Sequence, residues 1–293
     1  ADFISWVHRR FYEEMPDEFK FVERPDDTQI PIVPGAFRTE GDDDVVVGRH
    51  QPPSSSRVTA FMEHFSKRYK QARVGATNRV IAIAAAHHRL NFIHPFPDGN
   101  GRVSRLMSHA MALDAGIGGK GLWSISRGLA RGLHEKTEYK RMMDYADHSR
   151  MGDRDGRGNP SLKALEAYCE WFLSVTLDQI KFSSAVVSFD RLESRYRNLI
   201  SSVTDDKRAP DVISAVLRHG SMERGEINLV TKTSERTARN TLSELVHAGF
   251  LKSSSPKTPV RIAFPLDYRE RLFPNLFTDW EFDVPKPRPL SNR

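Results

Sequence analysis

The chain has 293 residues, of which 39% are hydrophobic and 28% charged, with a formal net charge of +6. This length allows one large or two medium domains with a buried core, and the longest apolar run, residues 80–86, is too short to span a bilayer. The acidic residues Glu13 and Asp17 argue against a signal peptide in the first turns. The single cysteine, Cys169, excludes an intrachain disulfide and predicts a reducing, cytoplasmic setting, with Cys169 in the core.

The first fifty residues are predicted to form a helix, a loop and a hairpin. Apolar side chains recur at every fourth position from Phe3 to Met15, which predicts a helix over residues 3–15. Residues 17–34 are rich in Pro, Asp and Glu and are predicted to be mostly loop. Residues 34–38 and 45–48 flank an acidic turn at 40–44, which predicts two short extended arms.

Two helices are predicted next, over residues 54–70 and 77–92. The first has an apolar face of Val58, Phe61, Met62 and Phe65, and the second has the small residues that a central bundle helix needs. His87 and His88 fall in the last turns of the second helix. Their spacing fits no standard metal site, so they are predicted to pack or to end the helix.

Residues 94–105, His-Pro-Phe-Pro-Asp-Gly-Asn-Gly-Arg-Val-Ser-Arg, hold the densest group of reactive side chains in the chain. They lead into an amphipathic helix, whose first backbone N–H groups and macrodipole favour an anion. Gly99 and Gly101 permit the close approach of a phosphate to the backbone. Arg102 and Arg105 lie on adjacent faces of the first helical turn, from which both guanidinium groups can reach phosphate oxygens.

The same stretch contains a candidate metal ligand and a candidate base. Asp98 offers the hard oxygen that Mg²⁺ prefers, and His94 can accept a proton near neutral pH. Each of these residues alone fits an ordinary turn, but turn chemistry does not require both arginines and the histidine. The residues therefore predict a site for a nucleotide-like phosphate and a metal, with a base beside it.

The stretch also resembles the Fic signature, His-x-Phe-x-Asp/Glu-Gly-Asn-Gly-Arg-x-x-Arg, at every specified position. The resemblance, which covers roughly residues 1–200, implies a mainly α fold, a Fic-type helical bundle with a small β-hairpin flap. It implies a nucleotidyltransferase, a protein adenylyltransferase that moves AMP from ATP to a Ser, Thr or Tyr hydroxyl of a target protein and releases pyrophosphate. Gly101 favours this activity over that of the Fic kinases, which have Lys at this position.

Roles for single residues follow from the resemblance. His94 deprotonates the target hydroxyl, Asp98 holds Mg²⁺, and Phe96 packs the loop into the core. Asn100, with the backbone of Gly99 and Gly101, cradles the α- and β-phosphates, while Arg102 and Arg105 clamp the distal phosphates. A flap over about residues 34–50 places Val46 and Val47 against the target, although an ordinary surface hairpin also fits these residues.

The resemblance also draws attention to a missing motif. Many Fic proteins have an inhibitory helix, Ser/Thr-x-x-x-Glu-Gly/Asn, and the only Glu-Gly here, Glu40-Gly41, has Ala36 at the hydroxyl position. Such a helix either precedes Ala1, comes from a partner or does not exist. Without it, the enzyme is expected to be constitutively active, and removal of AMP from a target is disfavoured.

Three further patterns lie between the signature and residue 200. Residues 116–120 resemble a Walker loop, but Asp114 and Gly121 break the pattern and favour a helix end. Tyr139 is expected either to line the adenine pocket or to pack. Residues 153–159 resemble a calcium loop, but Ala164 replaces the required Glu, so a surface turn is expected. Helices are predicted over residues 162–184 and 188–200.

A different pattern follows a polar linker at residues 201–209. Residues 210–265 predict three helices and a two-stranded wing, which together resemble a winged helix-turn-helix domain, and residues 266–293 an irregular tail. DNA binding would use Arg236, Arg239 and Asn240, with Lys252 or Lys257 on the wing, whereas Glu235 and Glu244 weaken the basic face. Dimerisation or partner docking stays open for this domain. The whole chain then fits either an adenylyltransferase, with another transferred nucleotide group also possible, or a nucleotide-sensing transcriptional regulator.

Overall fold

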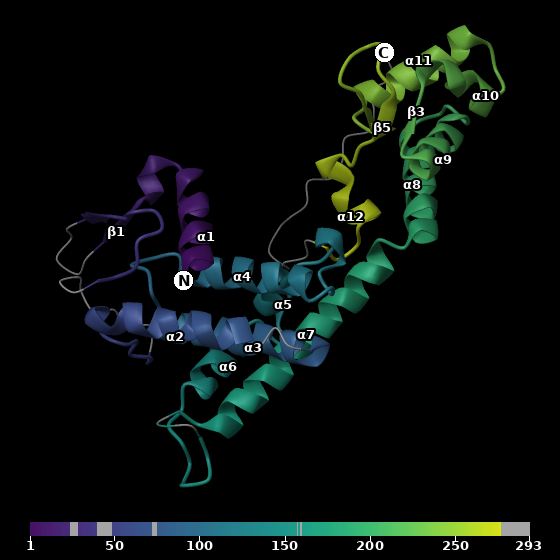
Figure 1. Cartoon of the computed structure of the whole chain (residues 1–293). Coiled ribbons are helices and arrows are strands. Elements are labelled where there is room, and N and C mark those ends of the chain that lie inside the picture. Colours follow the sequence, from purple (N-terminus) through teal and green to yellow (C-terminus); the bar gives the residue numbers. More distant parts are fainter. Residues whose placement is uncertain (24–28, 40–48, 72–74, 157, 159, 277–293) are drawn as a thin grey trace. The chain divides into compact units, whose positions relative to one another are not determined.

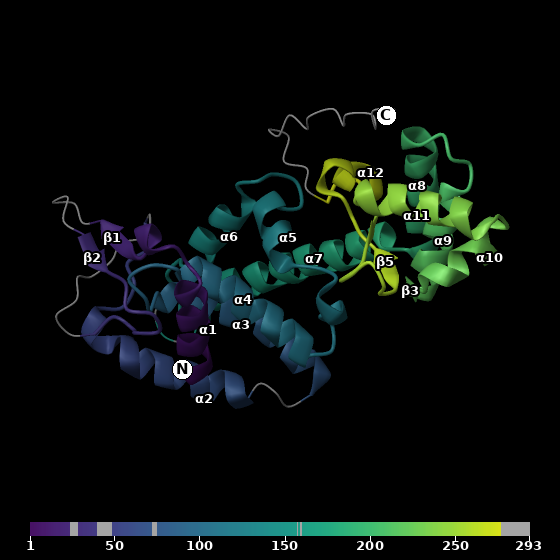
Figure 2. The same cartoon turned by 90° about the horizontal axis from the view of Figure 1, so that it is seen from above.

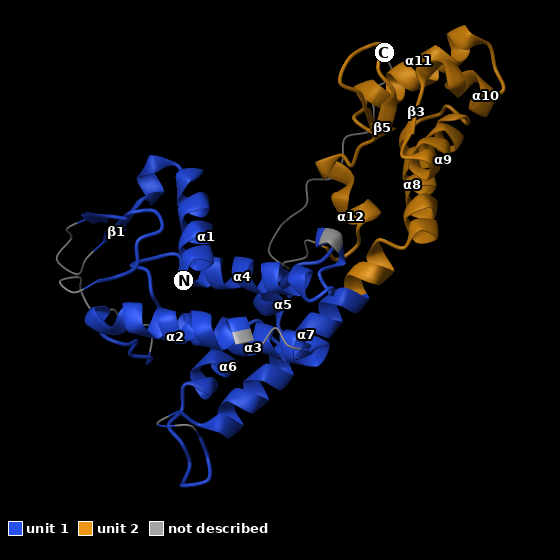
Figure 3. Ribbon diagram, viewed as in Figure 1, with its two compact units in different colours: residues 1–181 blue, residues 182–293 orange. Residues whose placement is uncertain are grey.

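The structure is a computed structural model that describes residues 1–23, 29–39, 49–71, 75–156, 158 and 160–276 (Figure 1). The chain divides into two compact units, residues 1–181 and 182–293, shown in different colours in Figure 3. Within the described residues, every helix is too short or too polar to cross a bilayer.

The first unit is mainly helical and contains one short antiparallel strand pair, β1–β2, which is visible in Figure 2. The last helix, α7, crosses the boundary into the second unit. The elements in chain order are α1 (Asp2–Glu13), the 3-10 helix η1 (Asp17–Phe19), β1 (Phe21–Glu23), β2 (Gln29–Pro31), η2 (Ser55–Arg57), α2 (Val58–Gln71), α3 (Ala76–Ile93), α4 (Asn100–Asp114), η3 (Gly119–Gly121), α5 (Ile125–Arg131), α6 (Glu138–Ala146) and α7 (Leu162–Val186).

Helix α3 holds the first unit together, because it takes part in both of the hydrophobic clusters of that unit. One cluster joins α1, α2, α3 and α4 and includes Val58, Leu90 and Met107. The other joins α3 to α5, α6 and α7 and includes Ala84 and Phe172. The small side chains predicted for this helix allow close packing on both sides, so that α3 and α4 present the loop between them from a rigid base.

Helix α1 forms where the sequence predicts a helix, but its row of apolar residues coincides only in part with its buried face. The buried side chains are Ile4, Val7, His8 and Tyr12, whereas Phe3 is 48% exposed. His8 and Tyr12 turn inward because both make hydrogen bonds to Asp98. The apolar spacing gives no sign of these polar contacts, so the hydrophobic pattern alone selects the neighbouring face.

The region between α1 and α2 also differs from its prediction. Residues 17–34, expected to be loop, contain η1 and the β1–β2 pair, in which Val22 lies opposite Ile30. The first arm of the predicted hairpin, residues 34–38, is a turn followed by irregular backbone, with Ala36 N–H donating to the Val33 carbonyl at 3.1 Å. Val46 and Val47, the predicted flap residues, lie outside the described residues.

The turn at residues 153–156 is held by its own carboxylate. Asp155 accepts hydrogen bonds from the N–H groups of Met151 and Lys163 and from the Ser161 hydroxyl. These hydrogen bonds lower the pKa of Asp155 to about 2. The carboxylate therefore fixes the entry into α7, in agreement with the predicted structural turn.

The second unit combines helices with a small antiparallel sheet of strand order β3–β5–β4. Ser234 opens α11 as its N-cap, as the sequence predicts. The elements are α8 (Phe189–Val203), α9 (Ala209–His219), β3 (Ser221–Met222), η4 (Arg224–Glu226), α10 (Ile227–Thr231), α11 (Glu235–His247), β4 (Leu251–Lys252), β5 (Val260–Ile262), η5 (Leu266–Tyr268) and α12 (Arg269–Leu272).

Helix α8 packs within the second unit. Tyr196, Leu199 and Ile200 join its hydrophobic cluster together with α9, α11 and the sheet. The boundary between the compact units therefore lies after Lys181, before the predicted domain end at residue 200. The tail, predicted to be irregular from residue 266, begins with η5 and α12, because Tyr268 and Leu272 are buried in the same cluster.

Candidate phosphate-binding turn and its base

The loop between α3 and α4, residues 94–99, begins and ends with left-handed backbone. His94 is the C-cap of α3 at φ 49°, and its N–H donates to the Leu90 carbonyl. Gly99 is the N-cap of α4 at φ 83°. A Cβ atom at Gly99 would lie 2.9 Å from the Tyr12 ring, so both the backbone angle and the space require glycine. The loop thus connects His94 directly to the start of α4.

Asn100 and Phe96 fix the shape of this loop. The Asn100 side chain accepts from the Phe96 N–H at 2.9 Å and donates to the Phe96 carbonyl at 2.8 Å. Phe96 is fully buried, as predicted, and its ring stacks on that of His8 at 3.9 Å between centroids. The Asn100 side chain is therefore used inside the loop, and it is the backbone of α4 that stays available to an anion.

Arg38 anchors the other side of the loop, a role that the sequence did not predict. Its guanidinium donates to the His94 carbonyl at 2.9 Å and to the Pro53 carbonyl at 3.1 Å, while its N–H donates to the Pro95 carbonyl. Arg38 is only 1% exposed. The buried cation satisfies carbonyl groups at the C-terminal end of α3, where the helix dipole is negative.

His94 is a neutral imidazole in this structure. Burial lowers the pKa of His94 to about 4, and the nearby positive charge of Arg38 acts in the same direction. The carbonyl of Asn91 accepts a hydrogen bond from the ring, which fixes one nitrogen as the donor. The other nitrogen then has a free lone pair, as a proton acceptor requires.

Asp98 lies one helical turn before Arg102, and its carboxylate is contacted by both Arg102 and a residue of α1. Tyr12 donates to it at 2.7 Å, and Arg102 forms an ion pair with it. Burial alone would raise the pKa of Asp98, but hydrogen bonds from Tyr12, Gly99 and Arg102 outweigh burial and lower it. Arg102 also lies over the Phe11 ring, at 5.1 Å from its centroid. Asp98 is therefore an ionised carboxylate on a well-ordered support.

The donor set at Asp98 fits Mg²⁺ only if substrate supplies further ligands. The Asp98 side chain is 47% exposed, and no group of three or more His, Cys, Asp or Glu side chains that could hold a metal occurs among the described residues. Mg²⁺ commonly binds one or two carboxylates together with substrate phosphates and water. Asp98 meets that pattern, because its exposed carboxylate lies beside the start of α4.

Arg105 differs from Arg102 in having no partner. One of its terminal nitrogens lies 3.2 Å from the position of a Cβ at Gly101, so the guanidinium covers the first turn of α4. The described part of the chain offers Arg105 neither a hydrogen bond nor an ion pair. A half-buried, unpaired guanidinium over a helix N-terminus is a strong attractor for an anion.

His87 and Tyr139 border Arg105, and their charges are fixed by burial. Ser108 donates to the Ser104 carbonyl and so accepts from His87 Nδ1, which leaves His87 Nε2 to accept from the Tyr139 hydroxyl at 2.9 Å. Burial, and then the charge of Arg105, lower the pKa of His87 to about 3. His87 therefore packs as predicted, and the Tyr139 hydroxyl is engaged with His87.

The structure brings together the predicted site residues His94, Asp98, Gly99, Asn100, Gly101, Arg102 and Arg105. Sequence reasoning missed His8, Tyr12, Arg38 and the Tyr139–His87 pair, which support the loop from outside the signature. The one available signal was the i, i+4 spacing of His8 and Tyr12 on α1, which places two polar side chains on one face.

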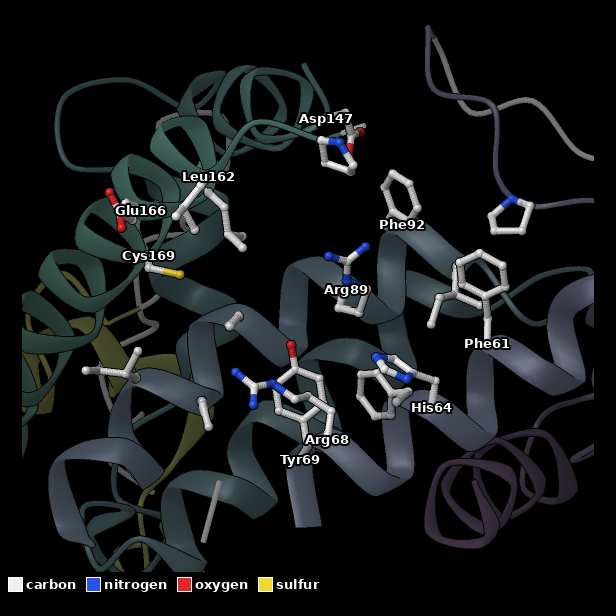
Figure 4. Close-up of a pocket in the computed structure, with 18 of the residues that line it drawn as sticks. Phe61, His64, Arg68, Tyr69, Arg89, Phe92, Asp147, Leu162, Glu166 and Cys169 are labelled. Atoms are coloured by element: carbon white, nitrogen blue, oxygen red, sulfur yellow. The ribbon is translucent and has the colours of Figure 1, made fainter. Parts of the chain in front are cut away.

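A cavity lies elsewhere in the first unit, between α2, α3 and α7 (Figure 4). Its volume is about 1370 Å³, and residues of the 94–105 stretch do not line it. Cys169, predicted to be in the core, is only half-buried and lines this cavity beside Glu166. Burial raises the pKa of the Cys169 thiol to about 11, so the thiol is protonated.

The site is thus a helix start of the class that suits an anion, with a guanidinium over its first turn and a preceding loop that begins at His94. Comparison with known proteins agrees with this class: residues 1–112 match the Fic/DOC family. The N-terminal part of the chain is thus similar to Fic/DOC proteins, and distant relatives of this part are named as protein adenylyltransferases.

Two relatives show how far the similarity extends. The protein adenylyltransferase Fic of Aedes aegypti is 38% identical over 86 residues, which make up 29% of this chain and 17% of that protein. The protein of the same name from Drosophila erecta is 37% identical over the same length. A Fic family protein from Desulfovibrio desulfuricans G20 gives a TM-score of 0.35 at 16% identity, covering 78% of this chain and 61% of that one, too low to support an argument.

Proposed function

We propose that this chain is a protein adenylyltransferase that transfers AMP from ATP to a Ser, Thr or Tyr hydroxyl of a target protein and releases pyrophosphate. The observation that carries the proposal is the Arg105 guanidinium, which has no ion pair among the described residues and lies over the first turn of α4. The loop that leads into this helix begins at His94, an imidazole whose pKa burial lowers to about 4. A site that only senses nucleotide needs the cation but has no use for the base.

The phosphate chain of ATP lies along the start of α4 in this proposal. The backbone at Gly99, Asn100 and Gly101 provides the first N–H groups of the helix, and Arg105 provides a fork for the distal phosphates. Arg102 reaches the same phosphates only by leaving its ion pair with Asp98. Release of Asp98 from Arg102 and its engagement with Mg²⁺ would therefore occur together.

The reacting step is an in-line displacement at the α-phosphorus. The target hydroxyl oxygen forms the new bond to phosphorus, its proton moves to the free ring nitrogen of His94, and the bond to the pyrophosphate oxygen breaks. Negative phosphates close to His94 raise its pKa from the low value of the free protein, which strengthens the base when substrate is bound. Mg²⁺ held by Asp98 would neutralise charge on the phosphates.

The decisive experiment compares two labels on ATP. The chain is incubated with Mg²⁺, a cell lysate and ATP labelled at either the α- or the γ-phosphorus. We expect protein-bound label from the α-labelled nucleotide only, and none from either nucleotide with His94→Ala. His134→Ala, which removes an exposed imidazole, is the matched control. Transfer of the γ-label would show a kinase instead, and equal transfer by His94→Ala would remove the proposed base.

ATP binding and function in cells distinguish the enzyme from a nucleotide-sensing regulator. We expect the His94→Ala protein to bind ATP with unchanged affinity in calorimetry while losing transfer, because His94 contacts the incoming hydroxyl. Normal function in cells after this substitution would favour a nucleotide-sensing regulator. The target, the flap contacts of Val46 and Val47 and the cytoplasmic location remain expectations from the sequence.

The second unit is proposed to be a winged helix over residues 210–265. Helices α9, α10 and α11 are followed by the β4–β5 hairpin, and β3 adds to the hairpin beside β5. This order of elements is the one that the sequence pattern predicts, with β3 as an additional strand. It supports a module with α11 as its exposed helix.

A further inference from the structure

Helix α11 has one buried face and one face that is open to solvent. Ala238, Leu242 and Leu245 enter the core of the second unit. The exposed face is a continuous stripe of hydrogen-bonding side chains at helical spacing, namely Arg236, Arg239, Asn240, Ser243 and His247. Arginine and asparagine are the side chains that read guanine and adenine edges in the major groove.

Cations of the second unit fall into two groups. One group, on α8 and α9, is neutralised within the unit: Arg197 pairs with Asp211, and Arg218 with the buried Glu193. Arg236 and Arg239 of α11 are exposed, and the described residues provide neither of them with an ion pair. Other exposed cations of the unit also lack an ion pair in the described part of the chain, but α11 places two of them one helical turn apart on its open face.

The β4–β5 hairpin extends this charge. Lys252 and Arg261 lie opposite each other across β4 and β5, and Lys257 lies in the turn between the strands. All three side chains are exposed. Arg224 braces the hairpin by donating to the Thr258 carbonyl and to the Ser253 hydroxyl. The hairpin is therefore a supported cationic arm attached to the same small unit as α11.

Two glutamates on α11 oppose this charge only in part. The pKa of the Arg208 guanidinium is raised mainly by its hydrogen bond to Asp206 and also by the charge of Glu244, so the Glu244 charge acts towards the α9 side. Glu235 lies in the first turn, one helical turn from Arg239, and no ion pair joins the two. Glu235 thus weakens the face locally without neutralising either arginine.

We propose that the second unit binds double-stranded DNA, with α11 in the major groove and the β4–β5 hairpin on the phosphate backbone. Arg236, Arg239 and Asn240 contact base edges, and Lys252, Lys257 and Arg261 contact phosphates. Exposed, unpaired cations that line both a helix and a neighbouring hairpin suit a long polyanion, since a small anion needs a concave site. This activity is separate from transfer at His94.

The test measures binding of the full chain to a fluorescent duplex of about 30 base pairs, roughly three helical turns, selected from a randomised pool. We expect each of Arg236→Ala and Arg239→Ala to weaken binding about tenfold and to relax the selected sequence. Lys252→Ala should weaken binding to all sequences alike and lower the salt slope by about one. Arg191→Ala, which removes an exposed cation from α8, is the charge-matched control and should retain wild-type affinity.

Several results would overturn the proposal. These are failure of the wild-type chain to bind duplex at low salt, equal losses for Arg239→Ala and Arg191→Ala, or preference for an RNA hairpin over the duplex. A change from dimer to monomer on Arg236→Ala in sedimentation, without duplex binding by the wild type, would assign the face to a second copy of the chain. Thermal melts of each variant separate lost binding from lost folding.

Discussion

The turn that begins α4 and the exposed face of α11 both place arginines on the first turns of a helix, yet they hold them differently. Around α4, Arg102 is paired with Asp98, and Arg105 is half-buried over Gly101. On α11, Arg236 and Arg239 are exposed and lack ion pairs among the described residues. Similar residue types thus produce a partly buried, internally paired arrangement in one unit and an exposed cationic helix face in the other.

The difference lies in the support behind each helix start. The loop before α4 is fixed by Arg38, Asn100 and the buried ring of Phe96, so its groups are organised before any ligand arrives. The residue before α11, Ser234, provides an ordinary N-cap and nothing more. Preorganisation favours catalysis on a small charged group, whereas an open surface favours a large partner that brings its own shape.

The largest effect is expected when an arginine of each helix is replaced by alanine and each variant is measured for both AMP transfer and DNA binding. Arg105→Ala should lower kcat/KM for transfer of AMP by about 10³-fold, because it removes the guanidinium that meets the distal phosphates. The same variant should retain wild-type affinity for duplex DNA. Arg239→Ala should show the opposite pattern, with transfer unchanged and DNA binding weakened.

Arg105→Lys sharpens this comparison. Lysine retains the charge but loses the fork that binds two oxygens at once, so an intermediate rate is expected. If Arg105→Ala transfers AMP as well as the wild type, the phosphate site is wrong. If instead Arg105→Ala and Arg239→Ala impair both activities, the two units do not act separately.

A smaller effect is expected when Asn100, which is buried, and Asn240, which is exposed, are each replaced by alanine. Asn100→Ala should lower the free energy of unfolding of the first unit by about 2 kcal/mol, because the buried N–H and carbonyl of Phe96 lose their partners. Urea denaturation followed by circular dichroism measures this change.

Asn240→Ala is the matched control for Asn100→Ala. Asn240 is exposed on α11, so its loss should leave the free energy of unfolding within experimental error. Equal stability of the two variants would contradict the view that Asn100 acts by holding the loop. In that case a direct contact between the Asn100 amide and the phosphates would be the better explanation.

The sequence was sufficient for the helices, and its signature selects the central residues of the candidate site. Periodicity located α1, α2, α3, α4 and α11 to within a few residues, because each buries an apolar stripe whose spacing is local. His94, Asp98 and Arg105 all fall within the twelve residues of the signature, 94–105. The candidate site is therefore local in the chain, as the helices are.

Contacts between distant segments could not be predicted in this way. Tyr12 and Asp98 are separated by 86 positions, and Arg38 meets the His94 carbonyl across 56. Such pairs have no periodic signal, so the apolar spacing of α1 marks Phe3 and Phe11, whereas polar contacts bury His8 and Tyr12. Polar anchors override the hydrophobic pattern because an unsatisfied buried group costs more than an exposed phenyl ring.

The smallest expected effect is a difference between the two units in how their stability depends on pH. Burial lowers the pKa of His8 and His94 to about 4 and that of His87 to about 3, each from 6.5. Between pH 6.5 and 4 the unfolded chain therefore binds more protons at these positions than the folded chain, so stability falls as pH falls. A fully unprotonated folded histidine contributes a loss on the order of 1 kcal/mol per pH unit in that window.

Hydrogen exchange followed by mass spectrometry can read this effect in each unit of the same chain. Amides of α3 and α4 should lose protection between pH 7 and 5, after correction for the intrinsic exchange rate, because His87 and His94 lie within or beside them. Amides of α9 and α11 should keep their protection, since His219 and His247 of the second unit are exposed. Parallel loss in both units would mean that the buried imidazoles are not what acid attacks, and that a feature common to both units governs unfolding.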